Sequence, residues 1–141
     1  MPDVRLFTIA EAEGALPLVR RILLDLQAEY PVWRAAVAAY EVVAGAARAD
    51  WGETPQLLAT REAVTASAEK INVWLRELDQ VGCVFKGFEP PLVDFYALRD
   101  DRPVFLCWHL GEERITHWHE IDAGYAGRQP IEPELLASRG H

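Results

Sequence analysis

Two histidines separated by one residue are the most chemically suggestive feature of this sequence. They are His117 and His119, in the stretch His-Trp-His-Glu that ends at Glu120. Alternate residues of a β-strand point to the same face, so a strand here would present both imidazoles to one ligand. Paired imidazoles suit zinc, iron, copper or nickel, and Glu120 lies where the strand would end. We therefore consider a divalent transition metal as a candidate cofactor at His117, His119 and Glu120.

A metal site needs at least one further ligand, and the sequence offers several. The candidates are His109, Cys107, Asp94 and Glu112. Which of them faces the histidines depends on the loop that joins the last two expected strands. A two-residue loop would put Leu106 and Trp108 beside the histidines. A three-residue loop would put Cys107 opposite His117, because a slip of one residue exchanges the faces of a strand. The sequence leaves both registers open, together with the reading in which both histidines are only hydrogen-bonded residues.

The same residues could support acid–base catalysis. His119, Glu120 and Asp94 are the catalytic candidates, although adjacent strand residues such as His119 and Glu120 would point to opposite faces of a regular strand. His119 is freer to pair with Asp94 or Asp122, but nothing in the sequence selects either partner. A cysteine nucleophile is a weaker candidate, because Cys107 lies in an apolar strand where burial raises the pKa of a thiol. The sequence does not decide whether the protein is an enzyme.

A second candidate site is the glycine-rich segment 124–130, Gly-Tyr-Ala-Gly-Arg-Gln-Pro. The backbone N–H groups of such a loop, with the guanidinium of Arg128, could bind a small anion. Arg128 could equally pair with an acidic residue of the protein. Trp108 and Trp118 lie in expected strands, where they could wall a ligand pocket or pack in the core.

The N-terminal half carries the pattern of a helix. Thr8 and Glu11 form a capping box that would start it. Apolar residues then recur at alternating steps of three and four, at Leu16, Val19, Leu23, Leu26, Tyr30, Trp33, Val37, Tyr40 and Ala44. Pro17 could kink this helix or start a second one. Pro31 predicts a bend rather than an end, because the apolar pattern keeps its phase across it.

A second helix is expected between Thr54, which is followed by proline, and Gly82, a residue suited to a helix C-terminus. Two helices joined by a short turn at 48–54 must lie antiparallel, in a coiled-coil-like hairpin. Trp51 in that turn would suggest a partner contact if it is exposed. The second helix carries a matching apolar seam at Leu57, Val64, Ala68, Ile71, Leu75 and Leu78.

After Gly82 the pattern changes to short β-strands. Strands are expected at 83–88, 92–96, 104–110 and 114–121, with turns at 89–91 and 111–112. The sheet segment is too small to fold alone, so we predict a single α+β domain over residues 1–141. Its parts are a long antiparallel helical hairpin at 8–82, a small antiparallel sheet at 83–122, and a loop and tail at 123–141.

The overall charge argues against nucleic acid as a partner. The chain has 22 acidic against 14 basic residues, for a net charge of −8, and no dense basic cluster. Its two cysteines are expected to be free thiols, and no apolar stretch reaches the length of a membrane span. The first residues lack the pattern of a signal peptide, so we expect a cytoplasmic protein that does not bind membranes.

Several stretches together resemble the bacterial family called domain of unknown function 2203. They are Phe-Thr-Ile-Ala-Glu-Ala at 7–12 with Leu-Pro at 16–17, Leu-Val-Asp-Phe at 92–95, Leu-Arg-Asp at 98–100, Val-Phe-Leu-Cys-Trp at 104–108, Trp-His-Glu at 118–120, and the segment 124–130. The resemblance covers nearly the whole chain but implies no established activity, cofactor or catalytic residue. It matches the family at Trp118-His119-Glu120 more closely than at His117. The resemblance therefore favours His119, Glu120 and Arg128 as a shared site.

The leading functional hypothesis is a binding or interaction protein that forms a homodimer through its helical hairpin. A second hairpin would cover apolar surface beside the two seams, at Leu18, Ile22, Val32, Leu58 and Trp74. One alternative is a metal-dependent hydrolase or oxidase centred on His119. The other is a protein that binds a small anionic ligand at the Gly124–Arg128 loop.

Overall fold

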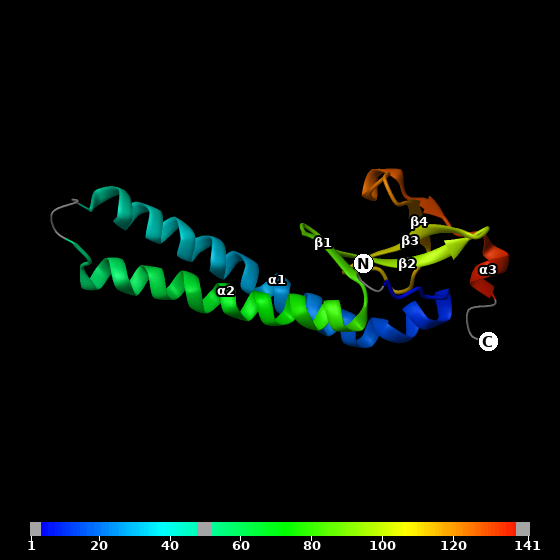
Figure 1. The fold of residues 1–141 in the computed structure, drawn as a ribbon, viewed down its shortest axis with the longest axis horizontal. Coiled ribbons are helices and arrows are strands. Elements are labelled where there is room, and N and C mark those ends of the chain that lie inside the picture. The colour runs from blue at the N-terminus through cyan, green and yellow to red at the C-terminus, as the bar shows by residue number, and fades with distance from the viewer. Residues whose placement is uncertain (1–3, 48–51, 138–141) are drawn as a thin grey trace.

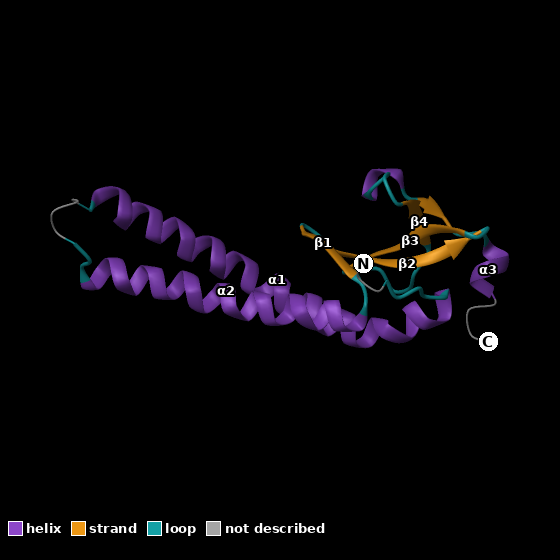
Figure 2. Ribbon diagram, viewed as in Figure 1, coloured by secondary structure: helices purple, strands orange, loops and turns teal. Residues whose placement is uncertain are grey.

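The computed structural model of the chain describes residues 4–47 and 52–137. Two long helices are followed by a five-stranded sheet and a short C-terminal helix (Figures 1 and 2), which confirms the α+β fold class. The elements are α1 (Ile9–Ala46), α2 (Pro55–Val81), β1 (Val84–Phe88), β2 (Pro91–Arg99), β3 (Arg102–His109), β4 (His117–Glu120), the 3-10 helix η2 (Tyr125–Gly127), β5 (Gln129–Pro130) and α3 (Pro133–Ala137). Among the described helices, none has the length and apolarity that crossing a membrane would require.

Helix α1 begins at the predicted capping box. The Thr8 hydroxyl accepts from the Glu11 N–H at 3.0 Å, and the Glu11 carboxylate accepts from the Thr8 N–H at 2.9 Å. The helix then runs without interruption through Pro17 and Pro31. The alternative in which Pro17 starts a separate helix is therefore excluded, and packing against α2 and the sheet stabilises a helix that contains two prolines.

Helix α2 has the predicted signals at both ends. The Thr54 hydroxyl accepts from the Leu57 N–H at 3.1 Å. At the other end Gly82 adopts a left-handed conformation with φ of 104°, and its N–H donates to the Leu78 carbonyl at 3.1 Å. The two helices lie antiparallel, and Figure 1 shows their connected ends reaching far beyond the sheet. Residues 48–51 of the predicted turn, with Trp51, lie outside the described residues.

The sheet is an antiparallel meander with the strand order β1-β2-β3-β4-β5. A two-residue turn at Asp100 and Asp101, both with positive φ, joins β2 to β3. The strand predicted at 104–110 is confirmed but shifted, since β3 begins at Arg102 and ends at His109. The predicted strand at 114–121 is too long, because residues 110–116 form a loop and β4 begins only at His117. This loop folds back on the end of β3, where the Glu112 N–H donates to the His109 carbonyl at 3.1 Å.

The segment after residue 122 contains more structure than the predicted loop and tail. It carries η2, β5 and α3, and β5 pairs with β4 through His117–Pro130 and Trp118–Gln129. Ile131 is 4% exposed, and its N–H donates to the Thr116 carbonyl at 2.9 Å. Ile131 thus holds the segment against the sheet. Its burial was not predicted, because the residues around it are glycine, proline and charged residues that are typical of loops.

The two faces of the sheet differ in chemistry because side chains alternate along each strand. One face packs against α1 and forms the core, with Val93, Phe95, Ala97, Val104, Leu106, Trp108 and Trp118. The opposite face carries Asp94, Tyr96, Phe105, Cys107, His117 and His119. Four of the candidate site residues, Asp94, Cys107, His117 and His119, therefore gather on the face that the helical hairpin does not cover.

Candidate functional site

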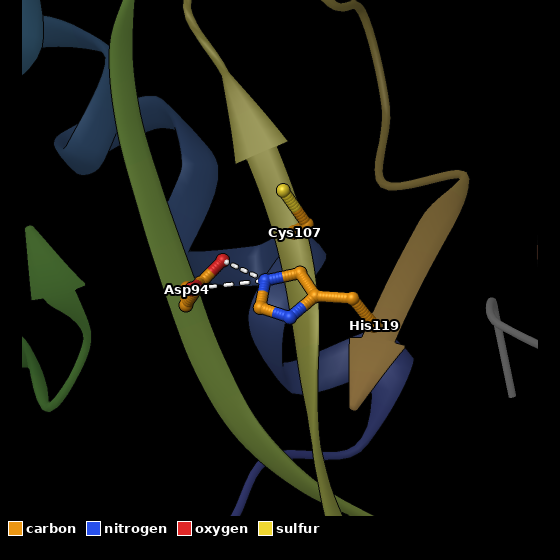
Figure 3. A group of neighbouring side chains, drawn as sticks. All are labelled: Asp94, Cys107 and His119. Atoms are coloured by element: carbon orange, nitrogen blue, oxygen red, sulfur yellow. Dashed lines mark hydrogen bonds and ion pairs between the residues drawn. The ribbon is translucent and has the colours of Figure 1, made fainter. Parts of the chain in front are cut away.

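Asp94, Cys107 and His119 meet on the polar face of the sheet. They come from the adjacent strands β2, β3 and β4, and Figure 3 shows the Asp94 and His119 side chains facing each other beside Cys107. One potential ligand atom from each residue lies within 4.8 Å of the other two. The exposed fractions are 2% for Asp94, 0% for Cys107 and 2% for His119. The three residues, called here the Asp–Cys–His group, therefore form a buried cluster of metal-ligating side chains.

The register of β3 and β4 brings the group together. Cys107 pairs with His117, and Phe105 pairs with His119. Of the two registers that the sequence left open, the structure has the one with Cys107 opposite His117. On the other side of β3, Cys107 pairs directly with Asp94 of β2. The side chains of Asp94, Cys107 and His119 consequently share one face.

The two ring nitrogens of His119 have different partners. Nδ1 lies 2.7 Å from the Glu120 carbonyl oxygen, which can only accept, so Nδ1 must carry a proton. Nε2 lies 3.1 Å from each carboxylate oxygen of Asp94. The contact between Nε2 and Asp94 is therefore bridged by one shared proton. When that proton leaves, Nε2 is the nitrogen that can bind a metal.

Burial controls the protonation of the other two residues. It raises the pKa of the Asp94 carboxyl, while the charge and hydrogen bond of His119 act in the opposite direction. It also raises the pKa of the Cys107 thiol to about 12, and the nearby Asp94 charge adds to this effect. Cys107 is therefore a neutral thiol near pH 7 and is not an activated nucleophile in this state.

Aromatic rings close the group from one side. The Phe105 ring packs against the His119 ring with centroids 5.3 Å apart, and Tyr96 packs on Phe105 at 4.5 Å. The ammonium of Lys86 lies 4.8 Å from the centre of the Phe105 ring. The Phe105 ring helps to exclude water from His119. The Lys86 charge, like that of His119, opposes the rise that burial causes in the pKa of Asp94.

A second polar cluster centred on Glu112 adjoins the group. The Glu112 carboxylate accepts from Arg128 Nη2 at 2.8 and 2.9 Å and from the backbone N–H of His109 at 3.0 Å. Arg128 Nη2 also donates to the Cys107 carbonyl at 3.4 Å. Burial by itself would lower the pKa of Arg128. The hydrogen bond and the charge of Glu112 act more strongly in the opposite direction, so the pKa of Arg128 is raised. Arg128 thus links the two clusters while its charge is balanced by Glu112.

His117 belongs to this second cluster rather than to the group. Its Nδ1 lies 2.8 Å from the Thr116 hydroxyl and 4.0 Å from the Glu112 carboxylate. Burial and the nearby Arg128 charge lower its pKa, so it is neutral at pH 7. Although His117 and His119 share a face as expected, they turn to different partners.

The Glu120 side chain lies on the opposite face of the sheet. Its carboxylate pairs with Arg102, which lowers the pKa of Glu120. Only its backbone carbonyl contacts the group, through His119 Nδ1. Adjacent residues of a strand point to opposite faces, and for this reason the Glu120 and His119 side chains do not pair.

The remaining ligand-binding candidates lie on different parts of the fold. Trp108 is fully buried in the core, and its Nε1 donates to the Glu112 carbonyl at 3.1 Å. Trp118 lines a cavity on the core face.

The role of Glu112 as the centre of a hydrogen-bond network was not expected, because it depends on the conformation of the loop at 110–116. The aromatic cover of Phe105 and Tyr96 could have been found, because these residues lie two positions from Cys107 and Asp94.

These observations define an α+β protein with a long helical hairpin on one face of its sheet and a buried Asp–Cys–His group on the other. Residues 5–131 match the model of a family described as an uncharacterised conserved protein, domain of unknown function 2203. The chain belongs to this family, as the resemblance indicated. No curated protein and no solved structure matches the chain.

Proposed function

We propose that the protein binds one divalent transition-metal ion through Asp94, Cys107 and His119. The observation that carries the proposal is that their ligand atoms lie within 4.8 Å of one another in a buried site. In a tetrahedral zinc site with bonds of about 2.0–2.3 Å, neighbouring ligand atoms are roughly 3.3–3.6 Å apart. The 3.1 Å between Nε2 of His119 and Asp94 is already close to that spacing.

The types of ligand favour zinc or another borderline transition metal. Thiolate and imidazole suit such ions, whereas magnesium and calcium prefer shells of oxygen atoms. The hydrogen bond from His119 Nδ1 to the Glu120 carbonyl supports the proposal, because an outer partner of this kind orients a metal-binding imidazole. The nearby charge of Arg128 would favour a thiolate at Cys107.

The proposal concerns metal binding and names no reaction. Three protein ligands leave a fourth position for water, as in catalytic zinc sites. However, the three side chains are each at most 2% exposed, so a substrate larger than water does not reach them in this conformation. The proposal does not extend to an anion at 124–130, because the charge of Arg128 is already balanced by its ion pair with Glu112.

Calorimetric titration of metal-stripped protein with zinc tests this proposal. We expect about one equivalent to bind, and a His119→Ala variant to bind at least tenfold more weakly. The matched control is His117→Ala, which removes the neighbouring imidazole on the same face and should keep its affinity. Circular dichroism verifies that both variants fold. The proposal is wrong if the folded wild type binds no zinc, or if both variants lose the same affinity.

A second proposal concerns the free end of the hairpin. The arm consists of residues 35–46 of α1 and 55–66 of α2, which extend away from the sheet (Figure 1), and none of its residues is buried. Val42 is 73% exposed and Leu58 is 41% exposed. Apolar helices of this kind are commonly buried in four-helix bundles. We propose that a second copy packs against the arm and forms a homodimer.

Sedimentation velocity over a range of protein concentrations tests the homodimer. We expect a dimer at micromolar concentration, and dissociation in a Val42→Glu variant because a charge would be buried at the contact. Leu98→Glu is the control, since Leu98 is similarly exposed but lies at the end of β2. A wild-type protein that stays monomeric throughout would refute the proposal.

A further inference from the structure

A cavity of about 520 Å³ lies on the face of the sheet opposite the Asp–Cys–His group. It is open to the surface and is lined by the segment before α1, the facing ends of β2 and β3, strand β4 and residues 131–135 at the start of α3. Its apolar wall includes Phe7, Ala97, Val104, Leu106, Trp118 and Ile131. This volume is within the range of about 300–1,000 Å³ found for small-molecule sites, and such sites are mostly apolar with few polar groups.

Trp118, one of the residues that line this cavity, has a buried polar atom without a partner in the described part of the chain. Trp118 is 5% exposed, and its indole Nε1 is buried without a hydrogen-bond acceptor among the described residues. Most buried donors in proteins are paired, so this N–H calls for an acceptor from elsewhere. The Arg99 guanidinium packs against the ring, 4.3 Å from a ring centre of Trp118.

The two arginines beside the Trp118 ring are each paired with a carboxylate. Arg99 forms a two-pronged ion pair with Glu132, which also lines the cavity. Arg102, whose guanidinium lies 5.9 Å from a ring centre of Trp118, pairs with Glu120. These pairs leave no unbalanced arginine to attract an anionic ligand. The carboxylate of Asp100, which also lines the cavity, would repel an anion as well. The cavity therefore does not suit an anion, and its mostly apolar wall favours an uncharged molecule.

Exposed apolar side chains extend the cavity wall to the surface. Leu6, Leu98 and Leu135 line the cavity and are 47%, 55% and 45% exposed. Single exposed leucines are ordinary, but here three of them border one cavity. The surroundings thus favour a ligand whose body is apolar.

We propose that this cavity binds a small, uncharged, largely apolar molecule that carries one hydrogen-bond acceptor, such as an aromatic ketone. Its apolar body packs against Phe7, Val104 and Leu106, and its oxygen accepts from the Trp118 N–H. The proposal is independent of metal binding, because Trp118 and His119 lie on opposite faces of β4.

A matched pair of probes tests both halves of the proposal. Acetophenone and ethylbenzene have nearly the same shape, but only acetophenone has a carbonyl oxygen. Binding is followed in the full chain by the indole N–H signals of ¹⁵N-labelled protein, and the Trp118 signal is the one missing from Trp118→Phe. Both probes should shift it saturably, and acetophenone should bind about three- to tenfold more tightly, the range expected for one hydrogen bond.

Two variants separate the apolar cavity from the hydrogen bond. Trp118→Phe should lower acetophenone binding to the level of ethylbenzene, followed by the shifts of nearby backbone amides. Ala97→Leu should weaken both probes, because the larger side chain fills part of the cavity. Trp33→Phe, a control on α1 away from the cavity, should change neither.

The proposal is overturned if neither probe shifts the Trp118 signal, or if the two probes bind equally. It is also overturned if the preference for acetophenone survives in Trp118→Phe. A Trp118 signal that moves with protein concentration alone would show that another copy of the chain occupies the cavity, and would equally overturn it.

Discussion

At the scale of single residues, His119 determines what the polar face can do. The Glu120 carbonyl fixes the proton on Nδ1, so Nε2 is left to share a proton with Asp94. A metal can enter only at Nε2, and the shared proton must leave when it does. The same contact stabilises Asp94 in a place where a carboxyl group is 2% exposed.

The energetic coupling of Asp94 and His119 can be measured directly. His119→Ala should destabilise the metal-free protein by about 1–3 kcal/mol, because it leaves a buried carboxyl without its partner. Adding Asp94→Ala should cost less than the sum of the two single changes, since no unpaired group then remains. Urea unfolding of the four proteins gives this comparison. Additive losses would show that the pair is not energetically coupled.

Metal affinity should rise with pH. Burial raises the pKa of Cys107 to about 12, so below that value the thiol must lose a proton before its sulfur can bind a metal. For the proton that the thiol releases on binding, the affinity rises by up to tenfold per pH unit. Zinc titrations between pH 6 and 8 test this slope, which should be shallower in Cys107→Ser. A pH-independent affinity would contradict the assignment of Cys107 as a ligand.

At the scale of elements, the change from helix to sheet depends on Gly82. Its φ is 104°, and an added Cβ would lie 3.0 Å from Cδ of Arg5 and 3.2 Å from its Cβ. Gly82→Ala should therefore destabilise the fold by about 1–2 kcal/mol. Gly14→Ala is the control, because Gly14 lies within α1 with open space around it and should gain about 0.5–1 kcal/mol. Thermal unfolding should move the two midpoints in opposite directions, and equal shifts would contradict this account.

Some of these elements follow from local sequence and others do not. The capping box at Thr8 and the stop at Gly82 are local signals, so the helix ends could be predicted closely. The loop at 110–116 could not, because the turn at residues 110–111 is followed by further loop residues before β4, where the Glu112 side chain accepts from the His109 N–H. Strand β5 is two residues long and depends on the burial of Ile131, a contact with no local pattern.

The candidate site shows the same division. Asp94, Cys107 and His119 could each be named from residue type, since carboxylate, thiol and imidazole are all metal ligands. Which of them share a face depends on the register of three strands, and a one-residue slip would exchange the faces. The sequence also could not show that His117 turns toward Thr116 and Glu112, because those contacts depend on the loop before β4.

At the scale of the whole molecule, the metal ligands link the three central strands of the sheet. A metal that binds only the folded state stabilises it by about 2.7 kcal/mol at a free concentration one hundred times Kd. Zinc should therefore raise the midpoint of thermal unfolding in proportion to the logarithm of its concentration. Cys107→Ser should show a much smaller rise, and a rise of equal size in that variant would indicate zinc binding elsewhere.

The most direct test of the proposed metal centre is the absorption spectrum of the metal-free protein as cobalt(II) is added. A thiolate bound to cobalt gives an intense near-ultraviolet charge-transfer band, and tetrahedral cobalt gives strong visible bands. We predict that both kinds of band saturate at one equivalent, and that the charge-transfer band disappears in Cys107→Ser. Their absence from the folded wild-type protein, or their persistence in that variant, would contradict a metal centre made of Asp94, Cys107 and His119.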